Sequence, residues 1–319
     1  MNFSAEDDDE NSTSTAAISS MFGEATEKTS GSRLGISYVR AQKPMLEVLL
    51  GTEIGQTLAL AQDVADEEAI SGVVWDAGLL MIDYLVTQKK NVKETWQTLI
   101  PQPSTDPSTG SVFLTHIPPV RYVLDLGCGT GVVGLVASAL SSSSFSSSGS
   151  ATVVYFSDKP STEHLAKSNM VNSTAGSGTE EFDATSEASV SPSRTFIAYD
   201  WLSGEPPPAA LCCPLGDDTC SWDIVYCSDV LYDDAVHIPL MQLLQKLQFK
   251  KVVFSYKKRY PGPERTFFQL LHTWCDLRVV PVAKKAEASE TNGVHLLNCT
   301  EAMTKAGGGL YIVEATPRS

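Results

Sequence analysis

The stretch VLDLGCGTGVVG, from Val123 to Gly134, decides how this chain folds. An apolar run reaches Asp125, closely spaced glycines follow, and the apolar pattern then resumes. This order predicts a buried strand, a glycine turn and the start of a helix. Such a turn lets the backbone approach a ligand closely, and the helix N-terminus offers free N–H groups. Dinucleotides and S-adenosylmethionine both bind at such turns, and the stretch alone leaves both open.

Composition narrows the class of protein. The chain has 319 residues, 42% of them hydrophobic, which is enough for one large domain with a sizeable core. The net charge of −15 has the opposite sign to that of a general nucleic-acid binder and suits a cationic partner. No stretch has the length and apolarity of a membrane span, and the acidic N-terminus resembles no targeting peptide. We expect a soluble monomer, cytoplasmic and also nuclear, that binds neither nucleic acid nor membrane.

The cysteines give no sign of a disulfide framework or a metal site. Their number, seven, is odd, and an intracellular protein keeps its thiols reduced. Cys212, Cys213, Cys220 and Cys227 form no CxxC pair. We therefore expect free thiols and no bound metal.

Polar, low-complexity segments divide the chain. Residues 1–32 are rich in Ser, Thr, Glu and Asp and predict a disordered acidic tail. The remainder, 33–319, predicts one domain with insertions near 141–150, 173–193 and 203–220.

Strands alternate with helices along the predicted domain. A β-hairpin extension, with strands on either side of Gly51–Gly55, comes first. Buried strands are then predicted at 122–127, 152–158, 195–201, 222–232 and 250–256. Helices are predicted at 71–85, from 132, and at 163–173, 236–247 and 265–275. Two closing strands, 277–283 and 309–315, have no evident helix between them. The pattern predicts a parallel α/β sheet with helices on both faces and a ligand site at the strands' carboxyl ends.

Three features separate the two candidate ligands. Asp125 stands two residues before a GxGxG turn, which resembles motif I of class I methyltransferases. The closing strand pair resembles the methyltransferase sheet, whose seventh strand inserts antiparallel beside the fifth. Ser228 to Tyr232, SDVLY, resembles the DxxY signature of one protein-lysine methyltransferase family. These features favour S-adenosylmethionine over NAD.

The resemblance to that lysine methyltransferase family covers roughly Leu46 to Ala315. The segments that carry it follow one another in the family's order: VVWDAGLLMIDYL, VLDLGCGTGVVGL, Asp158, Asp200-Trp201, SDVLY and FSYKKR. It implies a Rossmann-like seven-stranded sheet and an S-adenosylmethionine-dependent enzyme. The implied substrate is a lysine on a folded protein, such as an AAA-type ATPase or a chaperone. Two alternative functions stay open. The chain could be a methyltransferase that acts on another side chain or a small molecule, or a non-catalytic cofactor-binding partner protein.

The cofactor side of the expected site follows the glycine turn. Gly127, Cys128 and Gly129 are expected to contact the carboxypropyl end of the cofactor through backbone atoms; the alternative is an ordinary strand–helix turn. Asp158 ends the next strand and is expected to bind the ribose hydroxyls; the alternative is a capping role.

Two tryptophans and a serine complete that side. The resemblance places Trp75 against the cofactor and Trp201 near the adenine, although an aromatic residue at an element's end more commonly packs in the core. Ser228 borders the reacting end and is expected to contact the cofactor through its backbone.

Asp229 and Tyr232 are the residues expected to act on the substrate; the alternative is a capping Asp and a packing Tyr. Methyl transfer needs a neutral amine, and a carboxylate raises an amine's pKa. We therefore expect Asp229 to orient the amine rather than act as the main base, and Tyr232 to enclose the lysine side chain. Lys257, Lys258 and Arg259 would meet an acidic partner or lie in a solvated loop.

Overall fold

The computed structural model describes residues 43–50, 57–63, 70–99, 120–142, 152–175, 193–216, 220–280 and 309–318. The predicted tail at 1–32 lies outside the described residues, as do 143–150 and 176–192 of the first two predicted insertions. The division into a tail and one domain therefore stays a prediction.

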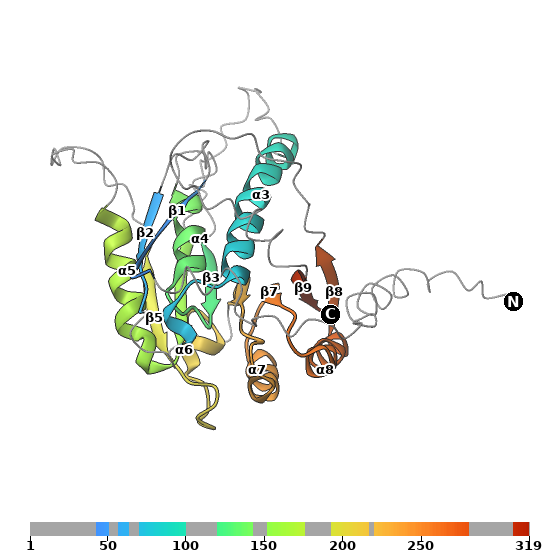
Figure 1. Ribbon diagram of the computed structural model, residues 1–319. Helices are drawn as coiled ribbons and strands as arrows, with labels where there is room; N and C mark the ends of the chain where they lie inside the picture. Colours follow the sequence, from blue (N-terminus) through green and yellow to red (C-terminus); the bar gives the residue numbers. More distant parts are fainter. Residues whose placement is uncertain are drawn as a thin grey trace, which may run out of the picture.

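A seven-stranded sheet forms the centre of the molecule (Figure 1), in the order β5-β4-β3-β6-β7-β9-β8. Its strands are β3 (Arg121–Leu126), β4 (Thr152–Asp158), β5 (Arg194–Ala198), β6 (Ile224–Ser228), β7 (Val252–Lys257), β8 (Cys275–Val280) and β9 (Leu310–Pro317). Strands β3 to β7 pair in parallel, and β9 inserts antiparallel between β7 and β8. The predicted Rossmann-like seven-stranded sheet with its antiparallel closing strand is confirmed.

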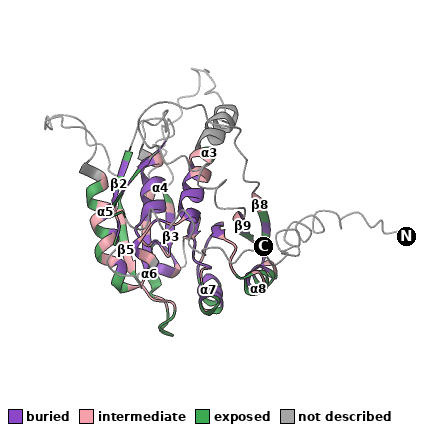
Figure 2. Cartoon of the chain, in the orientation of Figure 1, coloured by how far each residue is buried: buried purple, intermediate pink, exposed green. Residues whose placement is uncertain are grey.

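Helices cover both faces of this sheet. They are α3 (Asp76–Leu99), α4 (Val132–Ser142), α5 (Glu163–Ala175), the single-turn α6 (Ala209–Cys212), α7 (His237–Leu244) and α8 (Pro261–His272). In β3, Val123 belongs to the core shared with α3 and α4, whereas Leu124 and Leu126 belong to the core shared with α7 and α8. Burial on both faces explains the continuous apolar runs of the strands, and Figure 2 shows the buried residues gathered in this centre.

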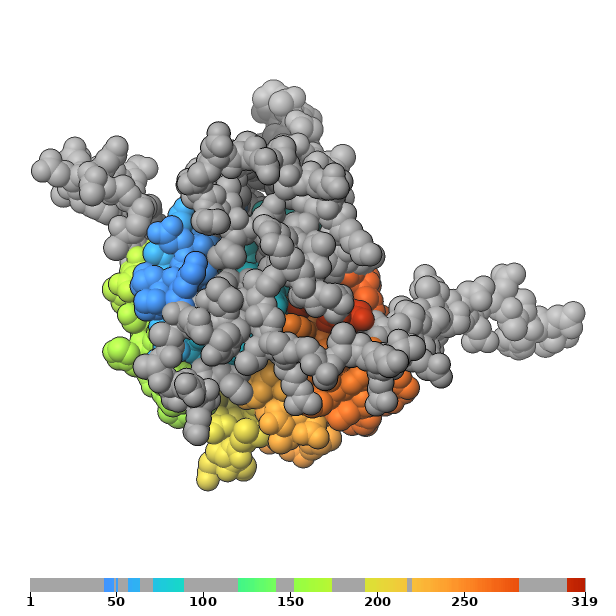
Figure 3. Space-filling model, in the orientation of Figure 1, coloured from blue at the N-terminus to red at the C-terminus, as the bar shows by residue number. Residues whose placement is uncertain are grey.

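The predicted N-terminal hairpin is present. Its strands β1 (Met45–Leu49) and β2 (Thr57–Ala61) pair antiparallel, and the hairpin lies against α5 in the space-filling view (Figure 3). Asn169 of α5 is fully buried and joins the two parts. Its Oδ1 accepts from the N–H of Ala61 at 2.8 Å, and its Nδ2 donates to the carbonyl of Thr130 at 2.9 Å. The hairpin is thereby linked to the glycine turn.

Several predicted boundaries are wrong. The strand predicted at 195–201 ends at Ala198, and the carboxylate of Asp200 instead accepts from the N–H of Leu202 in a turn. The strand predicted at 222–232 ends at Ser228, because Asp229 has φ +54, outside the extended region. The helix predicted from Ser71 begins at Asp76, after a 3₁₀ turn at Ile70–Gly72.

The cysteines of the described residues all carry free thiols. Cys213 and Cys220 bring their Sγ atoms within 3.3 Å of each other, beside the start of β6. Within the described ranges no cluster of His, Cys, Asp and Glu could hold a metal ion. The same ranges contain no helix with the length and apolarity to cross a membrane.

Candidate functional site

A cavity of about 380 Å³ lies where the parallel strands end, a volume typical of small-molecule sites. Parallel pairing brings Leu126, Ser157 and Cys227 into register, so β3, β4 and β6 end at one edge of the sheet. The lining comes from the segment before α3, the glycine turn, the ends of β4 and β5, and the segment after β6. Its residues are Ser71, Val73, Val74, Trp75, Gly78, Gly127, Cys128, Gly129, Thr130, Val132, Val133, Asp158, Lys159, Tyr199, Asp200, Trp201, Leu202, Ser228, Asp229, Val230 and Tyr232.

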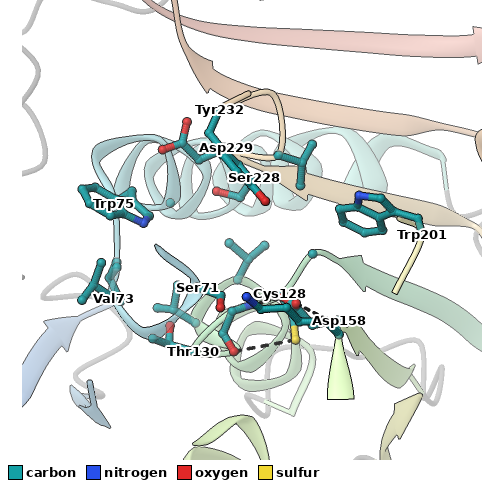
Figure 4. A pocket seen from close by; sticks show the side chains of 18 of the residues that line it. Ser71, Val73, Trp75, Cys128, Thr130, Asp158, Trp201, Ser228, Asp229 and Tyr232 are labelled. Carbon is teal, nitrogen blue, oxygen red and sulfur yellow. Dashed lines mark hydrogen bonds between the residues drawn. The ribbon is translucent and has the colours of Figure 1, made fainter. Parts of the chain in front are cut away.

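Every site residue predicted from the sequence lines this one cavity. In Figure 4, Trp75 and Trp201 lie at opposite ends of the cavity. Ser228, Asp229 and Tyr232 lie along one side, and Cys128, Thr130 and Asp158 lie along the other. The structure thus brings the residues together, and their individual roles stay predictions.

The glycine turn is packed too tightly for side chains. Gly127 has φ +71, and a Cβ atom there would lie 2.6 Å from Cγ1 of Val230 and 2.9 Å from Cη2 of Trp201. Gly129 has φ +52, and its Cβ would lie 2.7 Å from the carbonyl oxygen of Ser71. The turn therefore needs glycine both for its backbone conformation and for space.

Asp158 supports the glycine turn directly. One carboxylate oxygen accepts from the N–H of Gly129 at 2.8 Å, and the other accepts from the N–H of Lys159 at 2.7 Å. Burial raises the pKa of Asp158, while these hydrogen bonds act to lower it. Each oxygen keeps a second lone pair, so the predicted contact with ribose hydroxyls is chemically compatible with these bonds and stays a prediction.

Asp125 lies behind the cavity and holds the start of α4. Its carboxylate is buried, and Oδ2 accepts from the N–H of Gly134 at 2.8 Å. Burial raises the pKa of Asp125 to about 7. The pKa of an aspartate in the unfolded state is about 3.9, so the native state holds this proton to a higher pH than the unfolded state does. The free energy of unfolding therefore falls as the pH rises from about 4 to 7.

We expect Asp125→Asn to stabilise the protein increasingly as pH rises. The amide still accepts from Gly134 and has no charge to bury. Between pH 5.5 and 8, its advantage in free energy of unfolding should grow by about 2 kcal/mol, at about 1.4 kcal/mol per pH unit up to the native pKa. Urea denaturation of both proteins at the two pH values measures this. An advantage that is the same at both values would contradict the raised pKa.

Some lining residues are absent from the sequence prediction. The hydroxyl of Ser71 is buried and, among the described residues, has no hydrogen-bond partner. Its segment is held by Gln62, whose side chain accepts from the N–H of Val74 at 2.8 Å. The only signal for Ser71 in the sequence is its place just before the VVWDA segment.

Asp229 has a partner that the sequence does not reveal. Arg259 donates to both carboxylate oxygens, from Nη1 to Oδ1 at 2.7 Å and from Nη2 to Oδ2 at 2.8 Å. Arg259 thus pairs with a carboxylate inside the protein, with 26% of its side chain exposed, and a contact with an acidic partner stays a prediction. Lys257 lies 3.6 Å from the carboxylate of Asp76.

Tyr232 is half-buried beside acidic groups. Burial raises the pKa of its hydroxyl, and the negative charges of Asp158, Asp233 and Asp200 raise it further. The phenol therefore stays protonated at neutral pH, and its surroundings favour a cationic ligand.

Residues 53–182 match the family model described as lysine methyltransferase. The match includes the glycine turn and Asp158, and it covers less than half of the chain. The strand order described above is that of the class I methyltransferase sheet. No curated protein matches the sequence significantly.

Three solved structures are among those to which this chain is similar. The magnesium protoporphyrin IX methyltransferase of Synechocystis, with bound S-adenosylmethionine, has 14% identity and a TM-score of 0.35 over 75% of this chain and 84% of that one. A human methyltransferase 10 domain containing protein has 9% identity and a TM-score of 0.35, over 72% and 81%. The METTL16 methyltransferase domain has 8% identity and a TM-score of 0.38, over 82% and 73%.

Proposed function

We propose that this protein is an S-adenosylmethionine-dependent protein-lysine N-methyltransferase. The single observation that carries the proposal is one cavity that joins the glycine turn to Asp229 and Tyr232. The glycine turn lies within the stretch that matches the lysine methyltransferase model. The DxxY segment, beyond that stretch, lies across the cavity from the turn (Figure 4).

The residues present fit the cofactor. Gly127 and Gly129 line the cavity with backbone atoms alone, so no side chain blocks a ligand there. The N-terminus of α4 follows the turn. The hydroxyl of Ser71, which has no hydrogen-bond partner within the part of the chain that the structure describes, offers a further polar contact. S-adenosylmethionine, when bound, supplies a sulfonium methyl group for in-line displacement by an amine.

The chain's own residues would position the lysine. Only about one lysine in a thousand is neutral at pH 7.4, which adds about 4 kcal/mol to the barrier unless the site lowers the amine's pKa. Burial in the cavity favours the neutral amine. Tyr232 offers an aromatic face for the aliphatic stem and cationic head of the lysine.

For the substrate, we propose a lysine on a folded protein, an AAA-type ATPase or a chaperone. The order of the sequence segments resembles that of the lysine methyltransferase of valosin-containing protein, which is an AAA-type ATPase. The net charge of −15 favours a substrate with a basic surface around the lysine. A cytoplasmic and nuclear monomer fits this proposal.

Methyl transfer into a cell lysate tests the proposal. With tritiated S-adenosylmethionine we expect a labelled protein band whose acid hydrolysate contains methyllysine. Tyr232→Ala should remove most of the label, whereas Tyr260→Ala, at an exposed tyrosine outside the cavity, should keep it. Label in another amino acid or in small molecules would contradict lysine as the acceptor. If the wild-type protein binds S-adenosylhomocysteine but labels no acceptor, the result would favour the alternative that it is a non-catalytic, cofactor-binding partner protein.

A further inference from the structure

The ion pair between Asp229 and Arg259 lies at the substrate side of the cavity. Asp229 lines the cavity, whereas Arg259 does not. The side chain of Asp229 is 5% exposed, and both of its oxygens are held by the one guanidinium. Bidentate pairs of this kind are among the strong charge-assisted hydrogen bonds in proteins.

The backbone around the pair is fixed as well. Among the described residues, Asp229 is the one non-glycine residue with a positive φ, and its N–H donates to the carbonyl of Ser255 at 2.7 Å. The N–H of Arg259 donates to the buried carboxylate of Glu264 at 2.6 Å. Such a strained conformation persists only where its surroundings hold it, and it is typical of functional sites.

The charge of Asp229 poses a problem for methyl transfer. A bare carboxylate within about 4–6 Å of an amine favours the ammonium form and raises the amine's pKa by about 1–3 units. Only the neutral amine can attack a methyl group. A carboxylate that orients the amine would therefore also hold it in its unreactive form.

We propose that Arg259 is a positioning residue that cancels the charge of Asp229, so that the cavity presents a neutral, rigid acceptor to the substrate amine. This inference rests on the proposed function. Asp229 keeps lone pairs that can accept from the amine and orient it, and the adjacent guanidinium removes the net negative charge that would keep the amine protonated.

Arg259 keeps its charge in this position. Burial by itself would lower the pKa of Arg259, but the hydrogen bonds and charge of Asp229 raise it above its ordinary value, with smaller contributions from Glu264 and Asp76. The other charged groups around the cavity come from every neighbouring element. They are Asp158 at the end of β4, Lys159 after it, Asp200 after β5, Asp233 after β6, Lys257 paired with Asp76, and Glu264 in α8.

The pH profile of methyl transfer distinguishes this role from a purely structural one. The assay measures methyllysine in the principal band labelled by the wild-type protein, from pH 6.5 to 10. Arg259→Gln should move the rising limb of the profile to higher pH by about one unit or more. At a fixed pH below the limb, the activity then falls about tenfold for each unit of this shift. At high pH most of the activity should return.

Two further variants isolate the charge. Arg259→Lys keeps a cation next to Asp229 and should keep the profile within a few tenths of a pH unit of the wild type. The double variant Asp229→Asn with Arg259→Gln removes both charges and should bring the limb back toward the wild-type position. An equal loss of activity at every pH in Arg259→Gln would overturn the proposal and indicate a structural role alone.

A second measurement does not depend on a substrate. With S-adenosylhomocysteine present, n-butylammonium should bind Arg259→Gln at least tenfold more tightly than it binds the wild type at pH 7, and this gain should vanish in the double variant. Equal binding to all three proteins would overturn the role of Arg259. Failure of the wild type to form methyllysine would count against the proposed function, while this titration would still decide whether Arg259 neutralises Asp229.

Discussion

Gly127→Ala is expected to weaken the binding of S-adenosylhomocysteine at least tenfold while leaving the protein folded. The added Cβ would lie 2.6 Å from Val230 and 2.9 Å from the ring of Trp201, both in the cavity lining. Alanine at φ +71 adds about 1–2 kcal/mol of backbone strain. The turn must shift or Trp201 must swing into the cavity, so calorimetry should show affinity reduced at least tenfold, equivalent to about 1.4 kcal/mol.

Gly204→Ala is the matched control for this change. Gly204 has φ +76, nearly the same as Gly127, but a Cβ there would meet no atom within 4 Å, and the residue does not line the cavity. It should lose stability through the same backbone strain and keep its affinity. If both variants bind S-adenosylhomocysteine as the wild type does, the glycine turn is not where the ligand lies.

Gly134→Ala is expected to destabilise the fold even though alanine favours helices. A Cβ at this position in α4 would lie 2.8 Å from Cζ and 2.9 Å from Cδ1 of Phe156, and closer still to Cε1. Phe156 in β4 is fully buried and cannot move aside. Overpacking of this kind costs about 1–3 kcal/mol, which exceeds the gain of about 0.8–1 kcal/mol in helix propensity. Urea denaturation should show a lower free energy of unfolding.

Gly78→Ala should have the opposite sign. Gly78 lies in α3, where a Cβ would make only ordinary contacts, the nearest at 3.6 Å from Oγ of Ser228 and Cγ1 of Val74, so the helix propensity decides the sign. Combining Gly134→Ala with Phe156→Leu should recover part of the lost stability, because the smaller side chain gives the methyl group room. A stabilising Gly134→Ala would show that α4 does not pack on β4 as described.

The sequence carries most of the fold because both faces of the sheet are buried. Strands such as Thr152–Asp158 are continuous apolar runs that end in a polar residue, and their limits are visible without a structure. The ends of β5 and β6 could not be predicted from the apolar pattern. There, Asp200 and Asp229 leave the extended conformation through local hydrogen bonds and a positive φ that the apolar pattern does not record.

The residues of the candidate site likewise divide into those that the sequence predicts and those that it does not. The glycine turn, Asp158 and the SDVLY segment are short motifs, so sequence reasoning places them at one edge of the sheet. The pairing of Asp229 with Arg259 joins residues 30 positions apart, and the side chain of Gln62 fixes the segment at Val74 from the hairpin. Such contacts depend on tertiary packing, and no spacing rule predicts them.

The most direct test of the account is the choice of cofactor. Calorimetric titration of the wild-type protein with S-adenosylhomocysteine should give saturable binding at one site per chain, and titration with NADH should give none. Saturable binding of NADH with no binding of S-adenosylhomocysteine would contradict the proposal that this cavity holds a methyl donor.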